Sequence, residues 1–123
     1  MTLTIKIMSI TLDQKIIFAV RSNNIDLVKE RIAEGGNINY QDPKYGSALV
    51  TAINNGNEDT LKWLIENGVD VTATNEHGIG ALEVALRHPK PAIVKLLAWS
   101  GAKLNKKVRE HYGQRLEDCL KIG

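Results

Sequence analysis

The chain has 123 residues, of which 43% are hydrophobic and 24% are charged, with a formal net charge of +2 and a single cysteine. This length corresponds to one domain, and so small a net charge creates no overall field that favours nucleic acid or an anionic membrane. A single cysteine excludes an internal disulfide, and no apolar run approaches the roughly 20 residues of a membrane-spanning helix. We therefore expect an intracellular, cytoplasmic protein.

The first twelve residues lie outside the pattern that organises the rest of the chain. Leu3, Ile5 and Ile7 alternate with polar residues, as in a short strand. The segment lacks the charged and then apolar layout of a signal peptide. Because Met8 would be an equally natural start, we expect residues 1–7 to be dispensable or disordered, and we treat residues 1–12 as an N-terminal extension.

From residue 13 onward the sequence repeats with a period of 33 residues. Three turn glycines share this spacing, and so do small, apolar and lysine positions. A period of 20 to 50 residues is typical of stacked supersecondary units. The aligned sets are Gly35, Gly68 and Gly101; Ala19, Ala52 and Ala85; Val28, Leu61 and Val94; and Lys29, Lys62 and Lys95.

Each unit contains the pattern of two short helices. Residues 47–56 (SALVTAINNG) carry apolar side chains at helical spacing and stop at a glycine. Residues 57–68 (NEDTLKWLIENG) begin with a polar cap, carry one apolar stripe and stop at a second glycine. Residues 81–101 repeat this plan. Neither helix could bury its stripe alone, so the units must stack on one another.

The last segment, residues 112–123, matches the first helix of a unit. Leu116 corresponds to Leu49 and Cys119 to Ala52, with one residue inserted before them. We expect the chain to end in half a unit, and we expect His111 and the cations before it to lie in a projecting turn.

The period, the helix–turn–helix plan and the segments GGNIN, GVDV and GAKLN resemble the ankyrin repeat family. The resemblance implies an all-α solenoid of stacked helix-turn-helix units, with three repeats plus a C-terminal half-repeat. The ankyrin domain is expected over residues 13–123, with repeats at 13–41, 42–74 and 75–107 and the half-repeat at 108–123.

Two departures from the family pattern are visible. The usual threonine–proline–leucine–histidine helix start is reduced to SALV, GALE and QRLE. The hydrogen bond that this threonine and histidine usually make within a repeat is therefore mostly missing. Pro89 follows a first helix where the family has glycine, and its equivalents are Asn23 and Gly56. Those two residue types tolerate positive φ and proline does not, so the loop at Pro89 should differ, with Pro91 opening the next helix.

Few residues suggest a catalytic or metal-binding role. Cys119 occupies the small buried position of the repeat, which favours packing over a nucleophilic role. The three histidines, His77, His88 and His111, lack ligands at metal spacing. The chain contains no phosphate loop, dinucleotide fingerprint or nucleophile elbow, so we predict no catalysis, cofactor, metal or small-molecule substrate. Trp99 has two interpretations: a ring that covers the open end of the stack, which we favour, or an anchor for a partner.

The family resemblance sends the turn tips and the ends of the first helices toward one concave surface. Basic and amide residues collect there, whereas only Glu76 and Glu110 are acidic. A solvated surface is the usual explanation for such charges, but a basic groove is the alternative. The predicted partner-binding residues are Arg21, Lys44, Tyr45, Asn54, Asn55, His77, Arg87, His88, Lys106, Lys107 and Arg109.

The resemblance implies a non-catalytic protein-interaction module, and the charges suggest a partner with an acidic surface, bound by a monomer. One alternative is a cytosolic immunity protein or inhibitor that neutralises a toxin domain. A less favoured alternative is nucleic-acid binding through the basic C-terminal end, which has no aromatic platform to accompany its charges. An enzyme subunit is a fourth possibility, supported only by the presence of histidine and cysteine.

Overall fold

The computed structural model describes residues 10–87 and 89–121. The strand-like segment at residues 3–7 and His88 lie outside these described residues. The described elements are α2 (Leu12–Arg21), α3 (Ile25–Ala33), β1 (Gln41–Asp42), β2 (Gly46–Ser47), α4 (Ala48–Asn55), α5 (Glu58–Glu66), α6 (Ala81–Arg87), α7 (Pro91–Trp99) and α8 (Lys106–Lys121).

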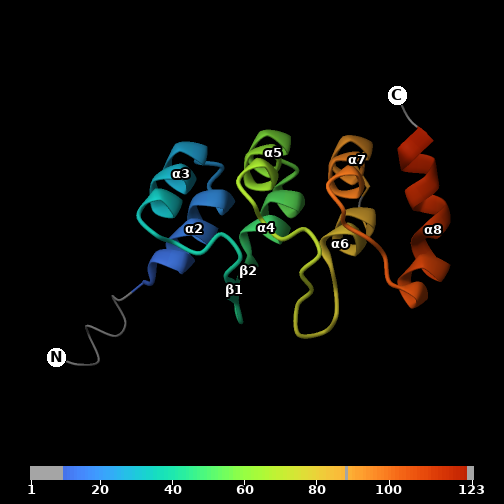
Figure 1. The fold of residues 1–123 in the computed structure, drawn as a ribbon, viewed down its shortest axis with the longest axis horizontal. Coiled ribbons are helices and arrows are strands. Elements are labelled where there is room, and N and C mark those ends of the chain that lie inside the picture. Colours follow the sequence, from blue (N-terminus) through green and yellow to red (C-terminus); the bar gives the residue numbers. More distant parts are fainter. Residues whose placement is uncertain (1–9, 88, 122–123) are drawn as a thin grey trace.

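The helices form two rows. Figure 1 shows α2, α4 and α6 in one row, which we call the inner helices, and α3, α5 and α7 in a second row, which we call the outer helices. The β1–β2 hairpin and the loop before α6 project away from the outer helices. Helix α8 closes the far end. This stacked, mostly helical arrangement confirms the predicted solenoid. Within residues 10–87 and 89–121, no helix combines the length and apolarity needed to cross a membrane.

Polar caps explain where most helices begin. Thr11 and Gln14 form a capping box at the start of α2, in which each side chain accepts a hydrogen bond from the other residue's backbone N–H. Asn24, Ser47 and Asn57 each accept a hydrogen bond from a backbone N–H of the first turn that follows. Short helices contain few internal hydrogen bonds, so their stability depends on such caps and on packing against neighbouring helices.

The ends of the inner helices follow the sequence prediction. Asn23 has a φ of 55° and Gly56 a φ of 67°, so both residues adopt the left-handed conformation that these residue types tolerate. Pro91 is the first residue of α7, where its missing N–H removes no helical hydrogen bond.

A single apolar core runs along the stack between the two rows. Ala19, Ala52 and Ala85 are all buried at the contacts between successive inner helices, and Ala52 has no exposed surface. Small residues at this position let neighbouring helices approach closely. The largest fully buried side chains of the core come from both rows and include Ile16, Val20, Val28, Leu61, Leu64, Leu82, Leu86, Val94 and Leu97.

Side chains of the next unit bond the last carbonyls of each inner helix. Asn55 Nδ2 donates to the Val20 carbonyl at 2.9 Å, and Lys90 Nζ donates to the Gly56 carbonyl at 3.3 Å. Arg115 Nη1 donates to the Leu86 carbonyl at 2.8 Å. Helix C-termini leave carbonyls without an internal partner, so these bonds satisfy them and join each unit to the next.

The C-terminal helix differs from the prediction. We expected Lys106, Lys107, Arg109 and His111 in a projecting turn, but they belong to α8, which begins at Lys106. The hairpin of the second unit contains Pro43 and Gly46, and the loop of the third contains Gly78 and Gly80. The corresponding segment of α8 contains no proline and only one glycine, Gly113, so a helix replaces the turn. The helix packs across both α6 and α7.

Candidate protein-interaction surface

The projecting loops and the inner helices enclose a groove of about 680 Å³. One wall comes from the β1–β2 hairpin and the other from residues 73–79, while side chains of α4 and α6 form the floor. The floor carries apolar side chains such as Leu49, Val50 and Val84, whereas the walls include polar side chains such as Gln41, Thr74 and Glu76. A groove with an apolar floor and polar walls is a shape in which proteins bind peptide segments.

Asp42 organises the first wall of the groove. Its side chain is only 7% exposed. It accepts hydrogen bonds from the backbone N–H groups of Lys44 and Tyr45 at 2.8 and 2.9 Å, from Gln14 Nε2 at 3.1 Å and from the Tyr40 hydroxyl at 3.0 Å. These bonds, led by that of the Tyr45 N–H, lower the pKa of Asp42 to about 2. The carboxylate therefore fixes the hairpin tip and ties it to α2.

A second carboxylate, that of Asp70, also lines the groove. It accepts hydrogen bonds from the hydroxyl and the backbone N–H of Thr72, and these lower its pKa. Asp42 and Asp70 thus add to the acidic residues that the sequence placed near this surface. The middle of the groove is mixed in charge rather than basic.

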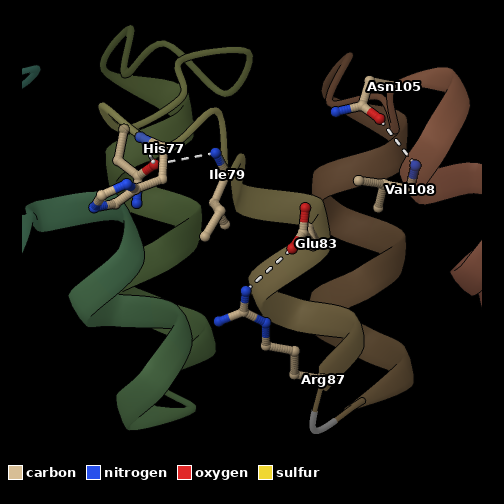
Figure 2. Close-up of polar contacts among 7 residues, drawn as sticks. His77, Ile79, Glu83, Arg87, Asn105 and Val108 are labelled. Atoms are coloured by element: carbon tan, nitrogen blue, oxygen red, sulfur yellow. Dashed lines mark hydrogen bonds and ion pairs between the residues drawn. The ribbon is translucent and has the colours of Figure 1, made fainter.

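Two of the predicted basic residues have acidic neighbours. Arg87 Nη2 lies 3.1 Å from Glu83 Oε2, one turn earlier on α6 (Figure 2). His77 Nε2 lies 3.5 Å from Glu76 Oε1 at the exposed loop tip. The sequence analysis counted only Glu76 and Glu110 as acidic residues of this surface and overlooked Glu83. Its i, i+4 spacing from Arg87 is the usual signal of a helical ion pair.

Arg21, Lys44 and Tyr45, three of the predicted partner-binding residues, come together at the N-terminal end of the surface. Arg21 Cζ lies 5.5 Å from the centroid of the Tyr45 ring, and Lys44 Nζ lies 5.2 Å from it. Phe18, which the sequence analysis missed, meets the same ring edge to face, with centroids 5.0 Å apart. Phe18 precedes Arg21 by three residues on α2, and this spacing indicates that the two side chains lie on the same face of the helix.

Lys106, Lys107 and Arg109 lie at the opposite end of the stack, in the first turn of α8. Asn105 caps this turn by accepting a hydrogen bond from the Val108 N–H at 2.9 Å (Figure 2). The three cations stand at the positive end of the helix dipole, with no acidic residue in the first turn. The basic residues therefore form two separated groups rather than one continuous stripe.

The two neighbouring asparagines of α4 have different surroundings. Asn54 is exposed and lines the groove. Asn55 turns its amide to the end of α2, where it bonds Val20 at 2.9 Å and comes within 3.4 Å of both the Arg21 carbonyl and Asn23 Oδ1. Asn54 is therefore the better placed of the two to meet a partner.

The remaining sequence candidates lie away from the groove. Trp99, on the outer helix α7, is 76% exposed and has Lys95 Nζ 6.0 Å from its ring centroid, so little of the ring covers the end of the stack. Cys119 is 5% exposed and packs into the core beside the last repeat, as its alanine-like register predicted. Across residues 10–87 and 89–121, no three acidic, histidine or cysteine side chains gather as a metal site would require.

Paired helices stacked in register, with hairpins projecting to one side, define a helical repeat protein of the kind that presents an extended binding surface. A family model described as "Ankyrin repeats (3 copies)" matches residues 16–108. The chain belongs to the ankyrin repeat family. Ankyrin repeats generally mediate protein–protein interactions, and they are in general non-catalytic.

Two curated relatives show the same repeats in much longer proteins. Ankyrin repeat and SAM domain-containing protein 6 of Rattus norvegicus is 30% identical over 94 residues, which cover 74% of this chain and 11% of the relative. Alpha-latrotoxin-Lt1a of Latrodectus tredecimguttatus is 33% identical over 79 residues, covering 64% of this chain and 6% of the relative. The chain thus spans only a small part of the length of either relative.

Proposed function

We propose that this chain is a non-catalytic, cytoplasmic protein-binding module that acts as a monomer and holds its partner on the groove side of the stack. The observation that carries the proposal is the groove itself, whose walls come from two successive units and whose floor comes from two inner helices. Such a surface can follow several residues of a partner at once, which a single-unit cavity cannot.

The charges around the groove support a partner with an acidic surface. Arg21, Lys44, Lys106, Lys107 and Arg109 form no salt bridge within the part of the chain that the structure describes. None of the five lines the groove; they lie towards the two ends of the stack, and the groove between them is mixed in charge. An acidic partner would therefore be steered by the ends and would bury apolar side chains in the middle.

Site-specific photo-crosslinking tests this proposal. A photoreactive side chain at Asn54, in the groove, is expected to crosslink the partner in cells. The same group at Lys62, exposed on the outer helix α5, serves as the matched control and is expected to give little product. Crosslinking from Lys62 with none from Asn54 would place the partner on the outer helices and contradict the proposal.

A further inference from the structure

Two cations are held against one aromatic ring at the N-terminal end of the groove side. Arg21 comes from the last turn of α2 and Lys44 from the tip of the β1–β2 hairpin, so the two belong to successive units. Both lie close to the Tyr45 ring, at 5.5 and 5.2 Å from its centroid. We call Arg21, Lys44 and Tyr45 the cation–tyrosine cluster.

The cluster is held from beneath by contacts that fix the ring. Phe18 packs edge to face against Tyr45, with an interplanar angle of 79°. Asp42 accepts hydrogen bonds from the backbone N–H groups of Lys44 and Tyr45, and Gln14 of α2 donates to the same carboxylate. The hairpin tip is therefore anchored to α2, and the cations start from a partly ordered arrangement, which lowers the entropy lost on binding.

The other cations of the surface differ from this cluster in one of two ways. Arg87 already pairs with Glu83, so binding an anion would compete with that ion pair. Lys106 and Lys107 form no salt bridge within residues 10–87 and 89–121, but the structure records no aromatic ring beside them. Two other described cations lie beside a ring and form no salt bridge there, but Lys95 and Trp99 belong to the outer helix α7, and Arg115 is bonded to the Leu86 carbonyl. On the groove side, the cation–tyrosine cluster therefore combines uncompensated charge with a fixed aromatic platform.

We propose that the cation–tyrosine cluster is the point at which this surface captures an acidic segment of the partner, with carboxylates of the segment meeting Arg21 and Lys44. This inference rests on the proposed function and deepens it, because it states where the partner is held and by what chemistry. In an extended segment, side chains two or three residues apart are separated by about 7–10 Å, which lets one strand reach both cations. The rest of the segment then enters the groove.

The probe is a short synthetic peptide that alternates glutamate and glycine, titrated into the isotopically labelled chain at low salt. The largest amide shifts are expected at Phe18, Arg21, Lys44 and Tyr45. A peptide that alternates glutamine and glycine is the neutral control and should shift these signals little. A peptide with phosphoserine in place of glutamate tests whether a phosphate is the better ligand.

Matched variants distinguish binding at the cation–tyrosine cluster from general attraction of the peptide to positive charge. The double change Arg21→Gln and Lys44→Gln should weaken binding of the glutamate peptide about five- to tenfold. The double change Lys106→Gln and Lys107→Gln removes the same charge from the other end and should weaken it less than about twofold. Tyr45→Leu keeps both cations but removes the ring, and should weaken binding about two- to threefold. All substituted cations are exposed, so these proteins should fold.

Several results would overturn the inference. Equal losses for the two double variants would mean that only net charge matters. Shifts confined to the start of α8 would move the site there, and an absence of shifts at Arg21, Lys44 and Tyr45 would remove it from the cluster. Binding of the phosphoserine peptide far tighter than its added charge explains would replace an acidic partner segment with a phosphorylated one.

A final comparison keeps this inference separate from the proposed function. If the partner crosslinks at Asn54 and the Arg21→Gln, Lys44→Gln protein retains its full affinity, the protein-binding function stands and the cluster is not the capture point. If no partner crosslinks at Asn54 while the cluster still binds the glutamate peptide, the groove function fails and the local chemistry stands.

Discussion

Arg115 of α8 donates a 2.8 Å hydrogen bond from Nη1 to the carbonyl oxygen of Leu86, near the end of α6. The same guanidinium lies 5.6 Å from the centroid of the Tyr112 ring, one turn earlier on α8. The Arg115 side chain thus gives a backbone carbonyl at the end of α6 a hydrogen-bond partner and helps to orient α8. Since each unit of a solenoid contacts only its neighbours, this bond adds to the packing of α8 against α6 and α7.

Replacing Arg115 with alanine should lower the free energy of unfolding by about 0.5–1.5 kcal/mol, because the Leu86 carbonyl loses its partner and the Tyr112 ring loses its cover. Urea denaturation measures the change. Arg109→Ala is the control: that side chain stands in the first turn of α8, where removing a cation should be neutral or slightly stabilising. Faster amide exchange in α8 without faster exchange in α2 would show that the loss is local.

Two glycine substitutions should act in opposite directions. A Cβ at Gly36 would meet Ile16 Cδ1 at 2.5 Å and the Arg31 carbonyl oxygen at 2.9 Å, so Gly36→Ala should cost about 1–3 kcal/mol of unfolding free energy. At Gly113, inside α8, the nearest atom is Arg109 Cγ at 3.5 Å, an ordinary contact. Gly113→Ala should therefore stabilise by about 0.5–1 kcal/mol. Thermal and urea unfolding of both variants checks the signs, and stabilisation by Gly36→Ala would contradict the packing at Ile16.

The seam between inner helices should not accept a larger side chain at Ala52. This residue is completely buried, with α2 on one side of its helix and α6 on the other. Ala52→Leu should cost about 1–3 kcal/mol, since the added atoms must push the stack apart. The control Ala92→Leu, at an exposed position of α7, should change stability by less than about 0.5 kcal/mol. Unchanged unfolding of the Ala52 variant would mean that the seam is looser than described.

The Asp42 carboxylate should make stability depend on acid pH. Its folded-state pKa of about 2 lies below the ordinary value of 3.8, so the ionised form favours folding. The stabilisation is complete above about pH 4 and is lost as the pH falls toward 2. Asp42→Asn should melt at a lower temperature than the parent at pH 7, and the two melting temperatures should converge near pH 2.

The control for Asp42 is Glu30→Gln, an exposed position on α3 whose side chain makes no hydrogen bond within the described residues. It should leave the melting temperature at pH 7 almost unchanged. Equal acid sensitivity of the parent and Asp42→Asn proteins would contradict the stabilising role of the Asp42 carboxylate.

On the alkaline side, the hydrogen bond to Asp42 raises the pKa of Tyr40 above its ordinary value of 10.0. Stabilisation from the neutral phenol is therefore present below pH 10 and is lost as the pH rises further.

Reversing the charge at the start of α8 should stabilise the helix. Lys107 lies in the first turn, where the helix dipole is positive, so Lys107→Glu should raise the unfolding free energy by about 0.5–1 kcal/mol at low salt. Lys121→Glu, at the other end of the same helix, should have the opposite sign. Both effects should shrink in high salt. Unfolding in urea at two ionic strengths provides the measurement.

The sequence by itself determined the repeat architecture of this protein. The 33-residue register of Ala19, Ala52 and Ala85 predicted which face of each inner helix is buried, and the structure confirms it. The ends of the inner helices could also be predicted from the sequence, because Gly56 and Asn23 are residue types that tolerate the left-handed conformation. These features are local or periodic, so they can be identified without knowing which elements meet.

Tertiary structure decided how the charges are distributed. Arg87 is compensated by Glu83, Asn55 turns to the end of α2, and Arg21 meets Lys44 across a seam between units. It also decided that a helix replaces the last predicted turn, since α8 packs across the end of the stack with Arg115 bonded to Leu86. Side-chain direction and partner choice depend on the neighbouring unit rather than on the periodic pattern, and that is why they could not be obtained from the pattern alone.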